Sequence, residues 1–345
     1  MDIFQEFTCG NHRALAKLIT MAENFEPGGF AIMSRLEKYR AEKAASNPSA
    51  ADEARQLIIG ITGPPGAGKS SLVDRLAREI LSVRKGSKVA VIAFDPSSPF
   101  TGGAILGDRV RMANFTSPDL FFRSMGTRGS LGGMSRCVPY VLRIYELFGF
   151  DYIIVETVGV GQIEVDVVKM TDTTIVTEVP GLGDDIQAIK AGIFEIGDIF
   201  VINKIDRPGV EKVFCEINYM LKLRHDKLFA EAGGRELWDV PLLKTNCVTG
   251  EGAGELFDAI LRHRDYLYTD GRIAANRRSR REEQYIGFIK DFLEGNILKV
   301  LRESDEFAGL VDNGDLDLLS GEKETSLKKI LSGLLMGLAE KIRNQ

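Results

Sequence analysis

The sequence predicts an α/β fold built on a doubly wound, mostly parallel β-sheet. Three observations support this prediction. Short apolar runs recur through the middle of the chain, amphipathic runs with helical spacing separate them, and a glycine-rich loop joins the first apolar run to the next helix. Several of the apolar runs are hydrophobic on both faces, which is typical of parallel strands buried between two layers of helices.

Residues 1–56 predict a helical extension ahead of the sheet. Leu15, Leu18 and neighbouring apolar residues have helical spacing. We expect Pro27-Gly28-Gly29 to form a turn between two helices, because proline and glycine interrupt helical patterns. Residues 44–55 are small and polar, which indicates a linker or a frayed helix end.

Residues 57–265 predict the α/β domain. A glycine-rich stretch within it, residues 123–136, indicates a loop rather than a strand. Six apolar runs have strand character: 57–62, 88–94, 151–156, 173–179, 198–203 and 240–245.

Residues 266–345 predict a helical arm, because no further strand pattern follows. The last helix carries an apolar stripe at Leu327, Leu331, Leu334, Leu338 and Ile342. This stripe fits packing against the same chain as well as pairing with a second subunit. Both interpretations remain open.

Composition excludes several classes of protein. The chain has 44 basic and 49 acidic residues, a net charge of −5, which argues against nucleic acid as the main partner. No apolar run approaches the roughly 20 residues of a membrane helix. The four cysteines have neither zinc-site nor disulfide spacing, and the N-terminus lacks a secretory or transit pattern, so we expect a cytoplasmic protein.

A phosphate-binding loop follows the first strand. Residues Gly63-Pro64-Pro65-Gly66-Ala67-Gly68-Lys69-Ser70 match GxxxxGK[ST], and Ser71 continues into a helix. Glycines allow successive backbone N–H groups to surround an anion at the positive end of that helix. In this motif Lys69 contacts the terminal phosphates, and the Ser70 hydroxyl can bind Mg²⁺.

The residues after a later strand indicate the base that is bound. Asn203-Lys204-Ile205-Asp206 has the NKxD pattern. The Asp206 carboxylate can accept hydrogen bonds from N1–H and the 2-amino group of guanine, which adenine cannot offer. Asn203 can contact guanine N7 or the phosphate loop, and the stem of Lys204 can cover the base. Cys247 and Val248 occupy the place of a further base contact after the last strand.

Acidic residues predict the metal and hydrolysis site. Glu156 ends a strand, and Gly159 follows three residues later, where its N–H can meet the γ-phosphate. This ExxG variant favours the SIMIBI branch of GTPases, which includes signal-recognition and metallochaperone proteins. Asp95, at another strand end, and Asp108 can complete a shell of Mg²⁺ ligands and waters, although both also fit turn or helix-cap residues.

Basic residues are candidates for neutralising transition-state charge. Lys190 follows a Gly/Asp loop, and an ordinary surface lysine explains it equally well. Arg123, Arg128 and Arg136 are further candidates.

The chain resembles the MeaB/ArgK family of P-loop GTPases, the chaperones of adenosylcobalamin-dependent methylmalonyl-CoA mutase. The resemblance covers residues 9–265 best. It rests on GITGPPGAGKSSLVD, VIAFDPSSPFTGGAILGDRVRM, DYIIVETVGVGQ, GLGDDIQAIKAGI and VINKID, which occur in this order.

The resemblance implies a GTPase that controls cobalamin loading onto the mutase and protects that enzyme. It also implies a homodimer joined by the C-terminal arm, and switch loops at residues 95–112, 156–165 and 180–190. Lys69 and Ser70 would hold phosphate and Mg²⁺, and Lys190 would be a switch lysine. Asp95, Asp108 and Glu156 would form the metal and water shell, and Asn203, Lys204 and Asp206 would recognise guanine.

Two other functions fit parts of the pattern. A metallochaperone GTPase shares the core but would need a metal-delivery cluster, and the only histidines, His12, His225 and His263, are spread along the chain and form none. A phosphotransferase would need an acceptor pocket and a base that deprotonates the acceptor. Transfer of phosphate to water alone, tested against an added acceptor, separates these functions.

Overall fold

The structure is a computed structural model. It describes residues 2–24, 26–46, 56–95, 117–126, 137–157, 170–181, 194–232, 237–269, 271–282 and 285–286.

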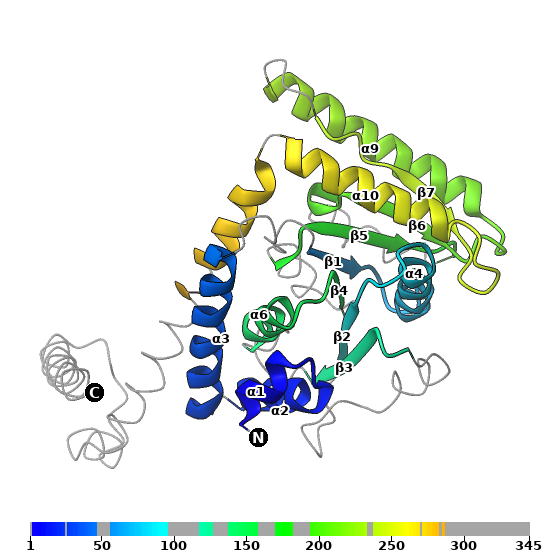
Figure 1. The fold of residues 1–345 in the computed structure, drawn as a ribbon. Helices are drawn as coiled ribbons and strands as arrows, with labels where there is room; N and C mark the ends of the chain where they lie inside the picture. The colour runs from blue at the N-terminus through cyan, green and yellow to red at the C-terminus, as the bar shows by residue number, and fades with distance from the viewer. Residues whose placement is uncertain are drawn as a thin grey trace, which may run out of the picture. The chain divides into compact units, whose positions relative to one another are not determined.

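The described strands form one parallel seven-stranded sheet, which confirms the predicted fold class (Figure 1). The strand order is β3-β2-β4-β1-β5-β6-β7. The strands are β1 (Leu57–Thr62), β2 (Val89–Asp95), β3 (Leu120–Gly126), β4 (Tyr152–Glu156), β5 (Thr173–Glu178), β6 (Ile199–Asn203) and β7 (Leu242–Thr245). The helices are α1 (Ile3–Thr8), α2 (His12–Glu23), α3 (Pro27–Ser46), α4 (Lys69–Val83), α6 (Val138–Phe148), α9 (Val210–Ala232) and α10 (Ala253–Thr269).

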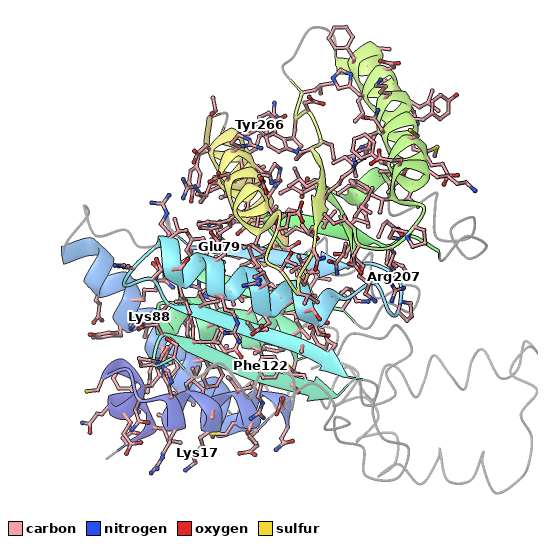
Figure 2. The ribbon with its side chains drawn as sticks, turned by 90° about the vertical axis from the view of Figure 1, so that its right-hand side faces the viewer. Lys17, Glu79, Lys88, Phe122, Arg207 and Tyr266 are labelled. Atoms are coloured by element: carbon pink, nitrogen blue, oxygen red, sulfur yellow. The ribbon has the colours of Figure 1, made fainter. Side chains whose placement is uncertain are left out.

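Helices cover both faces of the sheet, which explains why its central strands are apolar throughout. Helices α4 and α10 bury one face, where Leu76 and Phe257 pack against Ile59 and Ile154. Helix α6 and the N-terminal helices cover the opposite face over β2 and β4, and α9 covers it over β5 and β6. In Figure 2, Lys88, just before β2, and Arg207, after β6, lie toward opposite ends of the parallel strands.

The N-terminal helices are part of the main core. Leu15, Leu18 and Ile19 of α2 are completely buried in a cluster that includes Ile92 of β2 and Ile153 of β4. Burial of each such side chain contributes about 1.5–3 kcal/mol.

The chain divides into two compact units, residues 1–277 and 278–345. Helix α10 continues to Thr269, past the domain boundary predicted at residue 265. The three-domain division at 56 and 265 and the dimerisation arm remain predictions, and residues 287–345, with the apolar stripe of the last helix, lie outside the described residues. No helix in the described ranges is long and apolar enough to cross a membrane.

The loop predicted for residues 123–136 is wrong at its beginning, because β3 extends to Gly126. Strand β3 pairs with β2 along its whole length, from Leu120 against Val89 to Gly126 against Asp95. The glycines that suggested a loop lie after Met125, whereas the residues before it are apolar enough to pack on both faces.

The turn predicted at Pro27-Gly28-Gly29 is also wrong, because these residues begin α3. Proline suits the first turn of a helix, where its missing N–H has no intrahelical partner. Glycine is needed there because α2 passes close by: a Cβ on Gly29 would lie 2.9 Å from the Cβ of Met21.

An acid–histidine pair, with His263 buried and Asp198 half-buried, lies at the amino edge of the sheet, ahead of β6. His263 Nε2 of α10 is 3.5 Å from Asp198 Oδ1, and Asp198 Oδ2 accepts a hydrogen bond from Thr174 N at 2.8 Å. Burial raises the pKa of Asp198 to about 7 and lowers the pKa of His263 to about 4. Both groups are therefore neutral between these two values in the folded protein.

We expect single substitutions of this pair to tilt the pH profile of stability in opposite directions. Asp198, with a raised pKa, stabilises the fold fully below about pH 4 and loses this effect as pH rises through 7. His263, with a lowered pKa, stabilises it above about pH 6.5 and loses this effect as pH falls toward 4. Relative to the wild type, Asp198→Asn should therefore become less stable as the pH falls toward 4. His263→Gln should become less stable, relative to the wild type, as the pH rises toward 7.

Urea unfolding at several pH values between 4 and 7 measures these slopes. Each group can contribute at most about 1.4 kcal/mol per pH unit. Two variants whose profiles run parallel to the wild type would show that the pair does not titrate between these values.

Candidate functional site

The predicted nucleotide-binding residues come together at the carboxyl edge of the sheet. The parallel register places Glu156 of β4 beside Ile61 of β1 and Ala93 of β2. On the other side of β1, Asn203 of β6 lies beside Thr245 of β7. Ligands of doubly wound sheets bind at the carboxyl ends of the strands.

The phosphate loop connects β1 directly to α4, and glycine is required at its ends. Gly63, Gly66 and Gly68 have positive φ values of 143°, 79° and 87°. A side chain at Gly63 would collide with the carbonyl oxygen of Thr177, and one at Gly68 would collide with the Asn203 amide. The loop therefore passes against β5 and β6 with no room for a side chain at these two positions.

Lys69 begins α4 and is only 6% exposed. Its ammonium donates to the carbonyl oxygens of Gly63 at 2.7 Å and Pro64 at 3.0 Å. A buried ammonium needs such acceptors, and a bound phosphate would offer stronger ones. The cation is thus held at the loop where the motif places the terminal phosphates.

Ser70 and Glu156, two of the residues predicted to bind Mg²⁺, meet across the loop. The Ser70 hydroxyl donates to Glu156 Oε1 at 2.6 Å, and the Glu156 side chain is 6% exposed. Thr157 fixes the end of β4, because its N–H donates to the Ile61 carbonyl at 3.1 Å. A hydroxyl beside a carboxylate is the hard oxygen donor set that Mg²⁺ binds.

The segment 203–206, which is predicted to recognise the base, is attached to the phosphate loop by its own side chains. Asn203 Nδ2 donates to the Ala67 carbonyl at 2.9 Å, and Lys204 Nζ donates to the Gly66 carbonyl at 2.6 Å. Lys204 has a left-handed backbone, φ 58°, which a non-glycine residue rarely adopts. Of the two contacts predicted for Asn203, the structure contains the one to the phosphate loop.

The turn after β7 supports this segment from the other side. Thr245 Oγ1 and Cys247 Sγ both donate to Asn203 Oδ1 at 3.2 Å. Burial raises the pKa of the Cys247 thiol to about 11, so this group stays protonated and acts as a donor. Val248 has a 90% exposed side chain, and its role in contacting the base remains a prediction.

Asn246 belongs to the site although no sequence motif singles it out. Its Nδ2 donates to Asp206 Oδ1 at 3.2 Å, so it touches the carboxylate predicted to recognise guanine. Its position could have indicated this role, because Asn246 lies between Thr245 and Cys247 at the end of β7, and the neighbouring strand β6 carries the NKxD residues.

Arg123 is wrong as a candidate for neutralising transition-state charge. Its guanidinium on β3 donates to Glu23 Oε2 at 2.5 Å and to Thr20 Oγ1 at 3.1 Å, both on α2. This ion pair joins the N-terminal helices to the edge of the sheet.

Several predicted residues lie partly or wholly outside the described residues. The Asp95 backbone ends β2, but its side chain is not described. Among the residues that are described, no group of three or more His, Cys, Asp or Glu side chains could hold a metal ion. Asp108, Gly159, Lys190, Arg128, Arg136 and most of the three switch loops lie outside the described residues.

A parallel α/β sheet, a GxxxxGKS loop and an NKxD segment in contact with that loop define a P-loop GTPase. Residues 15–300 match the family described as methylmalonyl Co-A mutase-associated GTPase MeaB. The chain belongs to this family.

Individual relatives agree with this assignment. A relative from Pyrococcus horikoshii is 42% identical, over 96% of this chain and 98% of its own. The GTPase ArgK of Escherichia coli is 33% identical, over 86% and 85% of the two chains. A solved structure described as LAO/AO transport system kinase matches with a TM-score of 0.58 and 25% identity, over 96% of both chains. The protein therefore hydrolyses GTP.

Proposed function

We propose that this GTPase is the chaperone of an adenosylcobalamin-dependent acyl-CoA mutase, either methylmalonyl-CoA mutase or a related enzyme. The observation that carries the proposal is the match of residues 15–300 to a family described as mutase-associated. A relative from Caenorhabditis elegans, named methylmalonic aciduria type A homolog, supports it at 29% identity over 93% of this chain and 78% of its own.

The site residues divide the work of binding and hydrolysis. Lys69 would exchange the carbonyls of Gly63 and Pro64 for the terminal phosphate oxygens of GTP. Asp206 would accept the guanine N–H groups. Asn203 and Lys204 would hold the phosphate loop in register with the base.

Mg²⁺ fits the oxygen donors that the structure brings together. Ser70 and Glu156 would hold it, with Asp95 and Asp108 as proposed further partners. Bound Mg²⁺ supplies neutralisation of phosphate charge. Glu156 would keep the Ser70 hydroxyl oriented, and Lys190 would add positive charge from the third switch loop.

Nucleotide state would be communicated through the segments that follow β2, β4 and β5. We propose that residues 95–112, 156–165 and 180–190 are the switch loops, because each begins at the edge where the phosphates bind. The mutase would bind these loops and respond to their conformation. The GTPase would be a cytoplasmic homodimer joined by residues 266–345.

GTP turnover with and without a cobalamin-dependent methylmalonyl-CoA mutase tests the proposal. We expect slow hydrolysis that prefers GTP to ATP and rises when the mutase is added. Lys69→Ala is the control variant, since turnover that persists in it would come from a contaminating enzyme. GTP hydrolysis indifferent to several acyl-CoA mutases would contradict the chaperone role and leave the GTPase intact.

A further inference from the structure

Asn246 is held on two sides at the base-recognition end of the site. Its Oδ1 accepts hydrogen bonds from the backbone N–H groups of Val248 at 3.0 Å and Thr249 at 3.4 Å. Its Nδ2 donates to Asp206 Oδ1 at 3.2 Å, and the residue is 8% exposed. Its backbone is fixed as well, because its N–H donates to the Glu251 carbonyl at 3.0 Å.

This arrangement permits only one orientation of the Asn246 amide. A rotation that exchanged oxygen and nitrogen would place the NH₂ group against two backbone N–H donors. It would also turn the amide oxygen toward the Asp206 carboxylate. The turn therefore presents a fixed hydrogen-bond donor to Asp206.

We propose that Asn246 is a specificity-determining residue that positions the Asp206 carboxylate for guanine. Asp206 is exposed on the turn after β6, where a short polar side chain can adopt several rotamers. A donor fixed by the turn between β7 and α10 removes that freedom before the nucleotide binds, so less ordering is required on binding. The inference rests on the proposed binding of guanine by Asp206 and is independent of the mutase.

The neighbouring Cys247 provides a matched comparison. Its thiol donates to Asn203 Oδ1, so it acts on the side chain that faces the phosphate loop. Inosine diphosphate differs from GDP only by lacking the 2-amino group of the base. A residue that positions Asp206 should therefore affect discrimination between the two nucleotides, whereas one that positions Asn203 should weaken both alike.

Equilibrium binding of GDP and inosine diphosphate to the full-length protein tests the proposal. We expect Asn246→Ala to reduce the ratio of the two affinities by about tenfold, the scale of one hydrogen bond to a charged group. Cys247→Ala should weaken the binding of both nucleotides and leave the ratio of their affinities unchanged. Asn276→Ala, at an exposed position, should change neither affinity. The proposal would be overturned if the affinity ratio stayed unchanged in Asn246→Ala, or if it fell as much in Cys247→Ala as in Asn246→Ala.

Asn246→Asp adds a readout that a purely structural residue would not give. The substitution sets a second carboxylate against Asp206, and two adjacent carboxylates cannot both ionise easily. GDP affinity relative to wild type should be lowest near pH 8 and recover at least about tenfold near pH 5.5, because one shared proton restores a donor at position 246.

Asn246→Ser covers the case in which the alanine variant does not fold, since a hydroxyl can both accept from the turn and donate to Asp206. It should retain more of the GDP preference than alanine or, without a folded alanine variant, a measurable part of the wild-type ratio. A serine variant without selectivity, or an Asn246→Asp variant weakened equally at both pH values, would refute the role. These measurements contain no mutase, so a failed chaperone proposal would leave their result unaffected.

Discussion

Asp206→Asn is expected to shift the preference of the enzyme from GTP to xanthosine triphosphate. A carboxylate accepts two hydrogen bonds and therefore matches the N1–H and 2-amino donors of guanine. An amide offers one acceptor and one donor, which matches N1–H and the 2-carbonyl oxygen of xanthine. With GTP, the NH₂ group of the new amide would face the 2-amino group of guanine, donor against donor, so we expect kcat/KM for GTP to fall by about 10³-fold or more.

The structure makes this expectation specific to one orientation of the new amide. Asn246 Nδ2 lies 3.2 Å from Asp206 Oδ1, and it would bind the oxygen of the substituted amide in the same way. The same oxygen could still accept from N1–H through its second lone pair, and the NH₂ group would face the 2-carbonyl oxygen of xanthine. Steady-state kinetics with GTP, xanthosine triphosphate and ATP measure the change, with exposed Asp226→Asn as the matched control. Unaltered GTP selectivity would show that Asp206 does not contact the base.

Local sequence patterns predicted the phosphate loop and every described strand except β3, because these features depend on nearby residues. Strand β1 has the predicted bounds of 57–62, since a buried parallel strand is apolar along its full length. Lys69 and Ser70 follow from spacing within one loop. Glu156 was recognisable because an acid ends an apolar strand.

The features that were missed depend on residues far apart in the chain. Asn246 meets Asp206 only because β7 aligns with β6, so that Thr245 lies beside Asn203. Arg123 was predicted to lie in a loop, and only the packing of α2 against β3 provides its Glu23 partner. A periodic pattern predicts that an element is a helix or a strand, but it does not identify the surface on which that element packs.

Lys69→Ala is expected to abolish most GTP hydrolysis without unfolding the protein. The Lys69 ammonium is the buried cation of the phosphate loop, and loss of one such charge at a reacting phosphate should lower kcat by about 10²–10³-fold. In the absence of nucleotide, this ammonium donates hydrogen bonds to the carbonyls of Gly63 and Pro64. Removing it also removes the cost of burying a charge, which offsets the lost hydrogen bonds.

Stability and turnover should therefore separate in this variant. The nucleotide-free thermal unfolding midpoint should stay near that of the wild type, whereas the increase caused by saturating GDP should shrink, because ligand stabilisation follows affinity. Lys85→Ala, an exposed position in the turn after α4, should keep both properties. A Lys69→Ala protein with wild-type turnover would place the reacting phosphate away from this loop. A Lys69→Ala protein that unfolds without nucleotide would mean that the fold, rather than catalysis, requires this lysine through its contacts with the Gly63 and Pro64 carbonyls.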